Sequence, residues 1–174
     1  MTQNELKKIL AYDPLTGVFT WIAPRNNRYA KAGAAAGYER ENGYIRINIA
    51  GKLYYAHRLA VLYMTGEFPT NDTDHVNGTR SDNRWVNLRA ATRSQNLANK
   101  VVSSSSATGV KGVVFNRTKK KYVVNITVNG VQKYLGRFSD IEVAQSVYES
   151  AAKELQGEFY PATRIHQQEK RCVA

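Results

Sequence analysis

The chain has 174 residues, 43% of them hydrophobic, which supports one domain of ordinary size or two small ones. Its 25 lysine and arginine residues against 14 aspartate and glutamate residues give a formal net charge of +11. A positive field of this strength predicts a polyanionic partner, because it attracts and retains nucleic acid. A membrane surface is disfavoured as the alternative, since the sequence has no long apolar span and no clearly basic amphipathic segment.

Cysteine usage and the N-terminal sequence bear on the compartment. Cys172 is the one cysteine, which excludes an internal disulfide and a cysteine-rich zinc site and is typical of a reducing cytosol. The first stretch, MTQNELKKIL, is polar and charged and lacks the pattern of a signal peptide. We therefore expect a soluble, cytoplasmic protein.

The N-terminal part of the chain predicts a short helix, a strand and a basic loop. Thr2 and Glu5 have the spacing of a capping box, so a helix begins there. Turn residues over 13–17 end this helix, and a strand follows over 18–22. Residues 24–43 show no periodicity, and we interpret them as a mobile loop that either contacts phosphates or is merely solvated. Its basic residues are Arg25, Arg28, Lys31 and Arg40.

The next stretch predicts a β-hairpin followed by an apolar helix. Isoleucines alternate with polar residues over 44–49, the pattern of a half-buried strand, and a glycine turn leads into a second strand over 53–55. A short helix over 57–64 then ends at a glycine. Its first residue, His57, fits a packing or supporting role better than that of a metal ligand.

Residues 74–100 carry most of the polar chemistry of the chain. Asp74 and His75 are expected at the end of a short strand, where both side chains can line one shallow cleft. A glycine-containing loop then leads to a second strand over 88–91.

A helix is expected directly after this second strand. Thr92 and Gln95 form another capping box, so the helix begins near Arg93 and presents Asn96 in its first turn. The order is therefore strand, loop, strand and helix, with an acid and a histidine on one arm and an amide on the other.

These residue types suit the hydrolysis of a phosphodiester. A neutral His75 can take a proton from water near pH 7, and Asn87 could hold its ring by accepting the second N–H. Magnesium prefers oxygen ligands and keeps several waters, so a carboxylate and an amide carbonyl suffice to bind it. Arg93, or with less support Arg84, could hold the phosphate. A zinc hydrolase is disfavoured for lack of nearby His or Cys donors, and the remaining alternative is a polar loop with an ordinary surface histidine.

The C-terminal part predicts a small separate module. Four consecutive serines lie within 101–108, a composition typical of a flexible linker. Three strands follow, and Asn129-Gly130 is a hairpin signal between the last two. An amphipathic helix then begins at a capping box formed by Ser139 and Glu142. The strands are expected over 109–115, 122–128 and 131–135.

Several short motifs lie together between residues 54 and 100. They are the start of the apolar helix (His57 to Ala60), Asp74-His75, Asn77-Gly78, Asp82-Asn83-Arg84, Asn87-Leu88-Arg89 and Asn96. With these motifs the segment resembles the HNH nuclease family, whose core is the ββα-metal motif, in the phage homing and nicking variant where Asn replaces the last His. The resemblance implies that His75 is the general base and that Asn87 orients it. It also implies that Asp74 and Asn96 bind one Mg²⁺ or Mn²⁺ ion, with no structural zinc.

A second resemblance covers residues 109–160. Its framework residues are Gly109-Val110, Tyr122, Ile126, Tyr134-Leu135-Gly136, Phe138 and Gly157. With this framework the segment resembles the plant ethylene-response-factor (Apetala-type) DNA-binding domain, which lays a three-stranded sheet in the major groove. Val113 and Thr127 stand where arginines are usual in that family, so a weaker or different sequence preference is expected. The implied DNA contacts are Lys111, Phe115, Arg117, Lys119, Lys121, Asn125, Gln132 and Tyr134.

These features together predict an α+β protein. A ββα-metal HNH nuclease module is joined by a Ser-rich linker to a three-stranded antiparallel sheet plus one helix. The expected boundaries are 1–100 for the nuclease domain, with its core at about 73–100, then 101–108 for the linker, 109–160 for the DNA-binding domain and 161–174 for the tail.

The expected function is metal-dependent cleavage of double-stranded DNA. An endonuclease of homing or nicking type would leave 5′-phosphate and 3′-hydroxyl ends and act as a monomer or weak dimer in the host cell of a phage or mobile element. The alternatives are a sequence-specific DNA-binding regulator with a vestigial nuclease site and a protein that binds or cleaves RNA. The regulator is disfavoured by the intact set Asp74, His75, Asn87 and Asn96.

Overall fold

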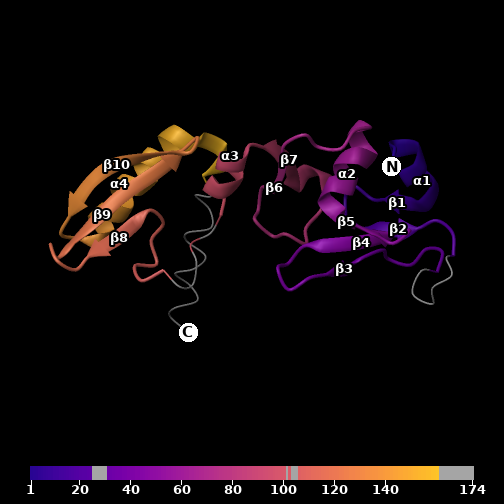
Figure 1. Ribbon diagram of the computed structural model, residues 1–174, viewed down its shortest axis with the longest axis horizontal. Coiled ribbons are helices and arrows are strands. Elements are labelled where there is room, and N and C mark those ends of the chain that lie inside the picture. The colour runs from indigo at the N-terminus through magenta and orange to yellow at the C-terminus, as the bar shows by residue number, and fades with distance from the viewer. Residues whose placement is uncertain (25–30, 101, 103–105, 161–174) are drawn as a thin grey trace. The chain divides into compact units, whose positions relative to one another are not determined.

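The computed structural model of the chain describes residues 1–24, 31–100, 102 and 106–160 (Figure 1). Arg25 and Arg28 of the expected basic loop, half of the expected linker, Cys172 and the tail lie outside these residues. The chain divides into two compact units, Met1–Ala91 and the part that begins at Thr92. Each unit combines short antiparallel strands with helices, which confirms the mixed α+β class.

The described residues of the first unit form three small antiparallel sheets and two α-helices. The sheets pair β1 with β2, β3 with β4 and β5, and β6 with β7. Its elements are α1 (Gln3–Ile9), β1 (Leu10–Tyr12), β2 (Phe19–Trp21), β3 (Tyr38–Glu39), β4 (Ile45–Ile49), β5 (Lys52–Tyr55), α2 (Ala56–Thr65), β6 (Asp72–His75), the 3₁₀ turn η1 (Trp85–Asn87) and β7 (Leu88–Ala91).

Local sequence signals set the start of α1 and the end of α2. Both halves of the predicted capping box are present at α1, where Thr2 accepts a hydrogen bond from the Glu5 main chain and Glu5 accepts one from the Thr2 main chain. Helix α2 ends at Gly66, which takes the left-handed conformation that a helix C-terminus favours. Both predicted helices are therefore confirmed, but the predicted end of the first is wrong, because α1 ends at Ile9 and β1 lies between it and the turn over 13–17.

The strand pattern also agrees with the sequence. In β4 the side chains of Ile47 and Ile49 are buried and that of Asn48 is exposed, as the alternation predicts. The same β4 pairs with β5 through Ile47 opposite Tyr54. Apolar side chains from α1, α2 and the first two sheets then form one core around Leu6, Leu10, Phe19, Ile47 and Leu59.

In the second unit, the residues that the structure describes form one α-helix before a three-stranded sheet and one after it. Figure 1 shows α4 running along one face of the sheet, whose order is β10, β9 and β8. Val124 and Ile126 of the central strand pack against Ala144 and Tyr148 of α4, all of them buried. The elements are α3 (Arg93–Ala98), β8 (Val113–Asn116), β9 (Lys121–Val128), β10 (Val131–Phe138), α4 (Ile141–Gln156) and the 3₁₀ turn η2 (Gly157–Phe159).

Two sequence signals in this sheet and helix have different outcomes. Asn129 and Gly130 both take positive φ values, 51° and 81°, which confirms the predicted tight hairpin between β9 and β10. The predicted capping box at Ser139 is wrong, because the carboxylate of Asp140 caps α4 by accepting from the main chains of Glu142 and Val143.

No helix within the described ranges is long and apolar enough to cross a membrane.

Helix α3 groups with the second unit, not with the strands that precede it. The ammonium group of Lys111 donates hydrogen bonds to the main-chain carbonyls of Leu97, Ala98 and Lys100 at the end of α3. The main chain of Asn129 also donates to the hydroxyl of Ser94, at 2.8 Å. These hydrogen bonds join α3 to the unit that begins at Thr92, whereas the expected boundaries place residues 93–98 with the preceding strands.

Candidate functional site

Strand β6 buries the acid and the histidine that the sequence singles out. Asp74 is 3% exposed and His75 is 4% exposed. Asp74 lies opposite Arg89 of β7, and the Arg89 guanidinium forms an ion pair with the Asp74 carboxylate at 2.8 Å. A carboxylate at this depth needs such a partner, because burying an unpaired charge is costly.

The ring of His75 lies among other aromatic rings and one amide. Its centroid is 5.1 Å from that of His57 and 6.0 Å from that of Tyr44. Its Nε2 atom lies 3.1 Å from the side-chain oxygen of Asn83. Burial lowers the pKa of His75 below its usual value, against the opposing effects of the Asn83 hydrogen bond and the Asp74 charge. The ring is therefore neutral near pH 7, as a general base must be.

His57 is buried and packs against His75, a position consistent with the packing role that its sequence context favours. Its ring stacks on that of Tyr55, with centroids 5.3 Å apart. Burial, followed by the neighbouring His75, lowers its pKa to about 3. Its Nδ1 atom has no hydrogen-bond partner among the described residues.

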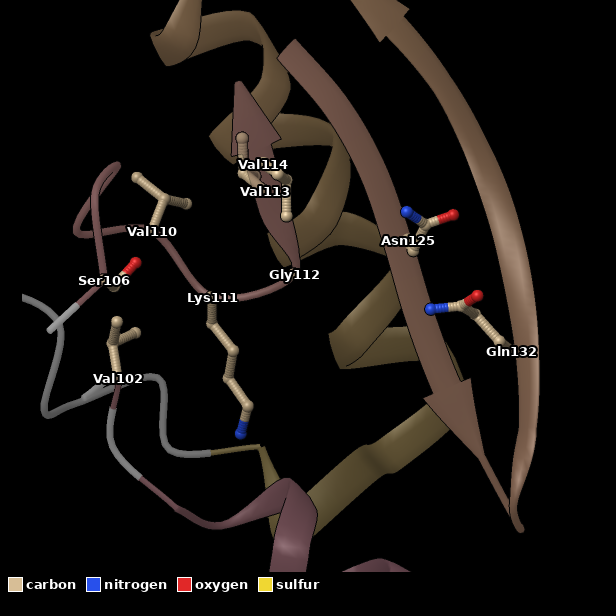
Figure 2. Close-up of a pocket in the computed structure, with 9 residues that line it drawn as sticks. All are labelled: Val102, Ser106, Val110, Lys111, Gly112, Val113, Val114, Asn125 and Gln132. Atoms are coloured by element: carbon tan, nitrogen blue, oxygen red, sulfur yellow. The ribbon is translucent and has the colours of Figure 1, made fainter. Parts of the chain in front are cut away.

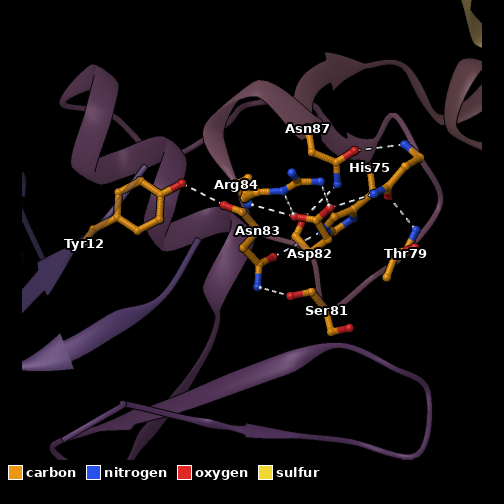
Figure 3. Close-up of polar contacts among 9 residues, drawn as sticks. Tyr12, His75, Thr79, Ser81, Asp82, Asn83, Arg84 and Asn87 are labelled. Atoms are coloured by element: carbon orange, nitrogen blue, oxygen red, sulfur yellow. Dashed lines mark hydrogen bonds and ion pairs between the residues drawn. The ribbon is translucent and has the colours of Figure 1, made fainter. Parts of the chain in front are cut away.

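The loop between β6 and β7 is closed by the side chain of Asn87 (Figure 3). The Asn87 carbonyl accepts from the main chain of Asn77 at 2.9 Å, and its amide donates to the main-chain oxygen of Asp82 at 2.7 Å. The sequence predicts that Asn87 accepts from the ring of His75, but the structure gives that position to Asn83. The reason is that both ends of the Asn87 amide are used to join the two sides of the loop.

Arg84 is engaged within the same loop. Its guanidinium donates to both carboxylate oxygens of Asp82, at 2.8 and 2.6 Å. The hydrogen bond from Arg84 is the main reason why the pKa of Asp82 falls to about 2. Arg84 therefore shapes the loop through Asp82.

Asn96 and Arg93 lie on α3 in the second unit. The predicted capping box is present, with Thr92 accepting from the main chain of Gln95 and the Gln95 side chain accepting from that of Thr92. Asn96 falls in the first turn and is half-buried, while Arg93 is exposed. The helix and its start are confirmed, whereas the metal and phosphate roles of these two residues stay predictions.

The donor atoms fit a hard divalent cation better than an enclosed metal centre. No group of three or more His, Cys, Asp or Glu side chains gathers in the part of the chain that the structure describes. Mg²⁺ needs fewer protein ligands, since it keeps several waters and shares the oxygens of its substrate. Asp74 offers a carboxylate, which the Arg89 guanidinium would have to share with the ion.

The predicted DNA contacts of the second unit do not share one surface. Asn125 and Tyr134 are paired across β9 and β10, on the side of the sheet opposite the buried Val124 and Ile126. Phe115 instead pairs with Tyr122, which packs on the α4 side, and their ring centroids are 4.9 Å apart.

The remaining predicted contacts are also divided among different parts of the unit. Arg117, Lys119 and Lys121 are exposed at the turn between β8 and β9. Lys111 is engaged by the end of α3, a structural role that the sequence did not indicate. Gln132 and Asn125 are among the residues that line a depression of about 380 Å³, and Figure 2 shows these lining residues.

Two residues that contact the acid and the histidine are missing from the sequence-based prediction. Arg89 faces Asp74 across the strand pair, and the expected hairpin register contained this signal, because opposed charges often pair across strands. Asn83 belongs to the Asp82-Asn83-Arg84 motif, but no spacing rule indicates that its side chain reaches His75.

Comparisons with known proteins agree with the HNH motifs. Residues 54–98 match the model of the family described as HNH endonuclease. An uncharacterized HNH endonuclease of Acanthamoeba polyphaga mimivirus is 29% identical over 129 residues, which cover 74% of this chain. The chain spans 66% of the length of that relative.

A solved structure of the HNH homing endonuclease I-HmuI, described by its DNA binding and cleavage, also resembles the chain. The likeness covers 72% of this chain and 71% of the other, at 23% identity and a TM-score of 0.42. A score of this size does not establish a shared overall fold. None of these comparisons supports the Apetala-type resemblance of the C-terminal segment.

Proposed function

We propose that this chain, which carries an HNH endonuclease domain, is a metal-dependent endonuclease acting on double-stranded DNA. The observation that carries the proposal is a buried, neutral His75 directly beside the Asp74 carboxylate on β6. A neutral imidazole next to an oxygen ligand for a cation suits water activation at a phosphodiester. The net charge of +11 supports DNA as substrate, because phosphate contacts dominate such binding.

His75 is the general base of the proposed reaction. It takes a proton from a water molecule, and the water oxygen forms a bond to phosphorus. The bond from phosphorus to the 3′ oxygen breaks, and that oxygen takes up a proton from solvent. The products are a 5′-phosphate and a 3′-hydroxyl.

Asp74 and Asn96 are the proposed metal ligands, and Mg²⁺ or Mn²⁺ is the proposed ion. A bound ion would neutralise charge on the phosphate and on the leaving oxygen. The assignment of Asp74 is supported by its buried carboxylate, while those of Asn96 and of Arg93 as phosphate contact rest on the sequence motif. Asn87 supports the site by holding the loop closed.

The segment 109–160 is the proposed DNA-docking module, of the Apetala type. Support comes from its sheet-and-helix arrangement and from the exposed bases Arg117, Lys119 and Lys121. These side chains would contact phosphates, while Asn125, Gln132 and Tyr134 would face the bases of the DNA. One proposed active site per chain predicts a nick rather than a double-strand break.

Incubation of supercoiled plasmid with the protein and Mg²⁺ or Mn²⁺ tests the proposal. The expected product is a relaxed circle that DNA ligase reseals without further treatment, because ligase needs a 5′-phosphate and a 3′-hydroxyl. A circle that forms but cannot be resealed would refute the proposed chemistry. Absence of a relaxed circle at every metal concentration would refute the enzyme.

A DNA-binding protein that does not cut is the second candidate. The observation that favours it is the ion pair between Asp74 and Arg89, which competes with a cation for the carboxylate. This candidate predicts tight, salt-sensitive plasmid binding without relaxation in the same experiment.

A further inference from the structure

Asn83 is buried without an assigned role. It is 1% exposed, the lowest value among the buried polar side chains of the described residues. A polar side chain at this depth costs free energy unless its hydrogen bonds are satisfied, so its partners indicate what it does.

The two ends of the Asn83 amide face different partners (Figure 3). Its nitrogen donates to the main-chain oxygen of Ser81, at 3.3 Å. Its oxygen therefore faces Nε2 of His75, at 3.1 Å. An amide oxygen can only accept, so the Nε2 atom must carry a proton in this arrangement. The basic lone pair of His75 then lies on Nδ1.

The main chain of Asn83 is held from a distant part of the first unit. The hydroxyl of Tyr12 donates to the Asn83 main-chain oxygen at 2.7 Å, in a buried position. Gly17 packs closely against the same main chain, so that a Cβ atom on Gly17 would overlap main-chain atoms of Asn83 and Arg84. The main chain of Trp85 also donates to Pro14, at 2.9 Å. The hairpin of β1 and β2 thus fixes the loop from which Asn83 reaches His75.

We propose that Asn83 is a positioning residue that selects the Nε2–H tautomer of His75 and directs Nδ1 to the attacking water. This inference rests on the proposed function, since it gives His75 the same proton transfer. The proton of the water moves to Nδ1, and Nε2 keeps its proton on the Asn83 oxygen. The amide oxygen then faces the positive imidazolium, which it stabilises as an acceptor.

Two variants at Asn83 separate this role from simple loop stability. Asn83→Leu keeps the size of the side chain and removes the acceptor, so single-turnover cleavage should fall at least about 100-fold. DNA affinity should stay within about two-fold of wild type, because the phosphate contacts that dominate it lie elsewhere. Asn83→Asp keeps an oxygen acceptor and should recover cleavage to within about ten-fold of wild type.

Tyr12→Phe is the matched control. It removes the hydrogen bond to the Asn83 main chain but leaves the Asn83 side chain in place. This variant should unfold more readily, and its cleavage rate should fall much less than that of Asn83→Leu. Cleavage by Asn83→Leu at the wild-type rate would overturn the proposal, and so would an equal loss of cleavage in the leucine and aspartate variants.

A spectrum of the free protein tests the tautomer without any cleavage. Nitrogen-15 NMR of labelled histidines separates protonated from unprotonated ring nitrogens, and His75→Ala identifies the signals of His75. The proposal predicts a proton on Nε2 in wild type and a mixture of tautomers in Asn83→Leu. A wild-type proton on Nδ1 would overturn it, even if the leucine variant fails to fold. If neither wild type nor any of the variants cuts DNA, the proposed function fails, and this spectrum still decides the role of Asn83.

Discussion

His57 and His75 place two neutral imidazoles side by side in the interior of the first unit. Their ring centroids are 5.1 Å apart, and burial lowers both pKa values below the usual 6.5. The folded protein therefore resists protonating either ring, while the unfolded chain accepts the proton freely. The free energy of unfolding that these residues contribute has its full value above pH 6.5. It decreases as the pH falls towards the pKa in the folded state, which is about 3 for His57.

Acid should destabilise the protein through these histidines, and His57→Phe should reduce the effect. Each pH unit below 6.5 costs up to about 1.4 kcal/mol for one such group, because the unfolded state binds the extra proton. Phenylalanine keeps an aromatic ring against Tyr55 and cannot titrate. Urea unfolding between pH 4 and pH 7 should show a shallower loss of stability in the variant. Parallel curves for the two proteins would contradict the assignment.

The buried ion pair between Arg89 and Asp74 should contribute to stability and should compete with a bound metal ion. The pair is buried, with side-chain exposures of 15% and 4%, so Arg89→Met leaves the carboxylate without its guanidinium partner. Removing one member of a buried pair typically costs about 3–5 kcal/mol. If Asp74 is a metal ligand, Mg²⁺ should raise the melting temperature of the variant more than that of wild type. An equal response to Mg²⁺ would argue against Asp74 as ligand.

The residue types in the sequence predict the candidate chemistry of the site, but they do not predict the hydrogen bonds within it. Asp74 and His75 could be singled out from the sequence because an adjacent acid and histidine have little use in an ordinary core. The hydrogen bond between Asn83 and His75 could not, because it depends on how the loop folds back on itself. The same fold uses up the amide of Asn87, for which the sequence predicts a hydrogen bond to the histidine.

At the scale of elements, the hairpin of β1 and β2 is a brace for the loop that holds His75. Tyr12 and Gly17 touch the main chain of Asn83, far along the sequence. A residue in the hairpin can therefore affect the candidate site without lying in it.

Gly17→Ala tests this brace, with Gly51→Ala as its control. Both glycines have positive φ, 75° and 84°, so alanine costs about 1–2 kcal/mol at either position. At Gly51 a Cβ meets open space, but at Gly17 it overlaps main-chain atoms of Asn83 and Arg84. Gly17→Ala should lose about 1–3 kcal/mol more stability than the control in urea unfolding. It should also cut DNA more slowly, and equal behaviour of the two variants would contradict a bracing role for the hairpin.

Elements that depend on local chemistry were predictable, and those that depend on distant partners were not. The capping boxes at Thr2 and Thr92 and the Asn129-Gly130 turn act within a few residues of themselves. No local signal in the sequence predicts strand β1, because its three residues form a strand only by pairing with β2. The cap of α4 fell one residue from its predicted place, since both Ser139 and Asp140 can serve and the structure uses the carboxylate.

At the scale of the whole molecule, the chain is two compact units, and the sequence predicts their division at a different place. The serine-rich composition of 101–108 indicates a linker, but composition cannot reveal that Lys111 binds the end of α3. That tertiary interaction joins α3 to the second unit. The second unit therefore begins at Thr92, before the linker that the composition indicates.

The salt dependence of DNA binding tests the proposed roles within the second unit. Replacing Arg117, Lys119 and Lys121 by glutamine should reduce the slope of log affinity against log salt by about 0.9 for each phosphate that the variant no longer neutralises. Asn125→Ala should leave that slope unchanged and alter the preferred sequence, because its proposed partner is a base. Fluorescence anisotropy at several salt concentrations measures both. An unchanged slope in the triple variant would exclude this turn from the interface.

The central claim is that His75 performs the chemistry while the charge that binds DNA lies elsewhere. The most direct test measures plasmid nicking and DNA affinity on the same preparations of wild type and His75→Ala. We predict a loss of at least about 100-fold in nicking rate, with affinity within about two-fold of wild type. Nicking by the alanine variant at the wild-type rate, or an equal loss of nicking and affinity, would contradict the claim.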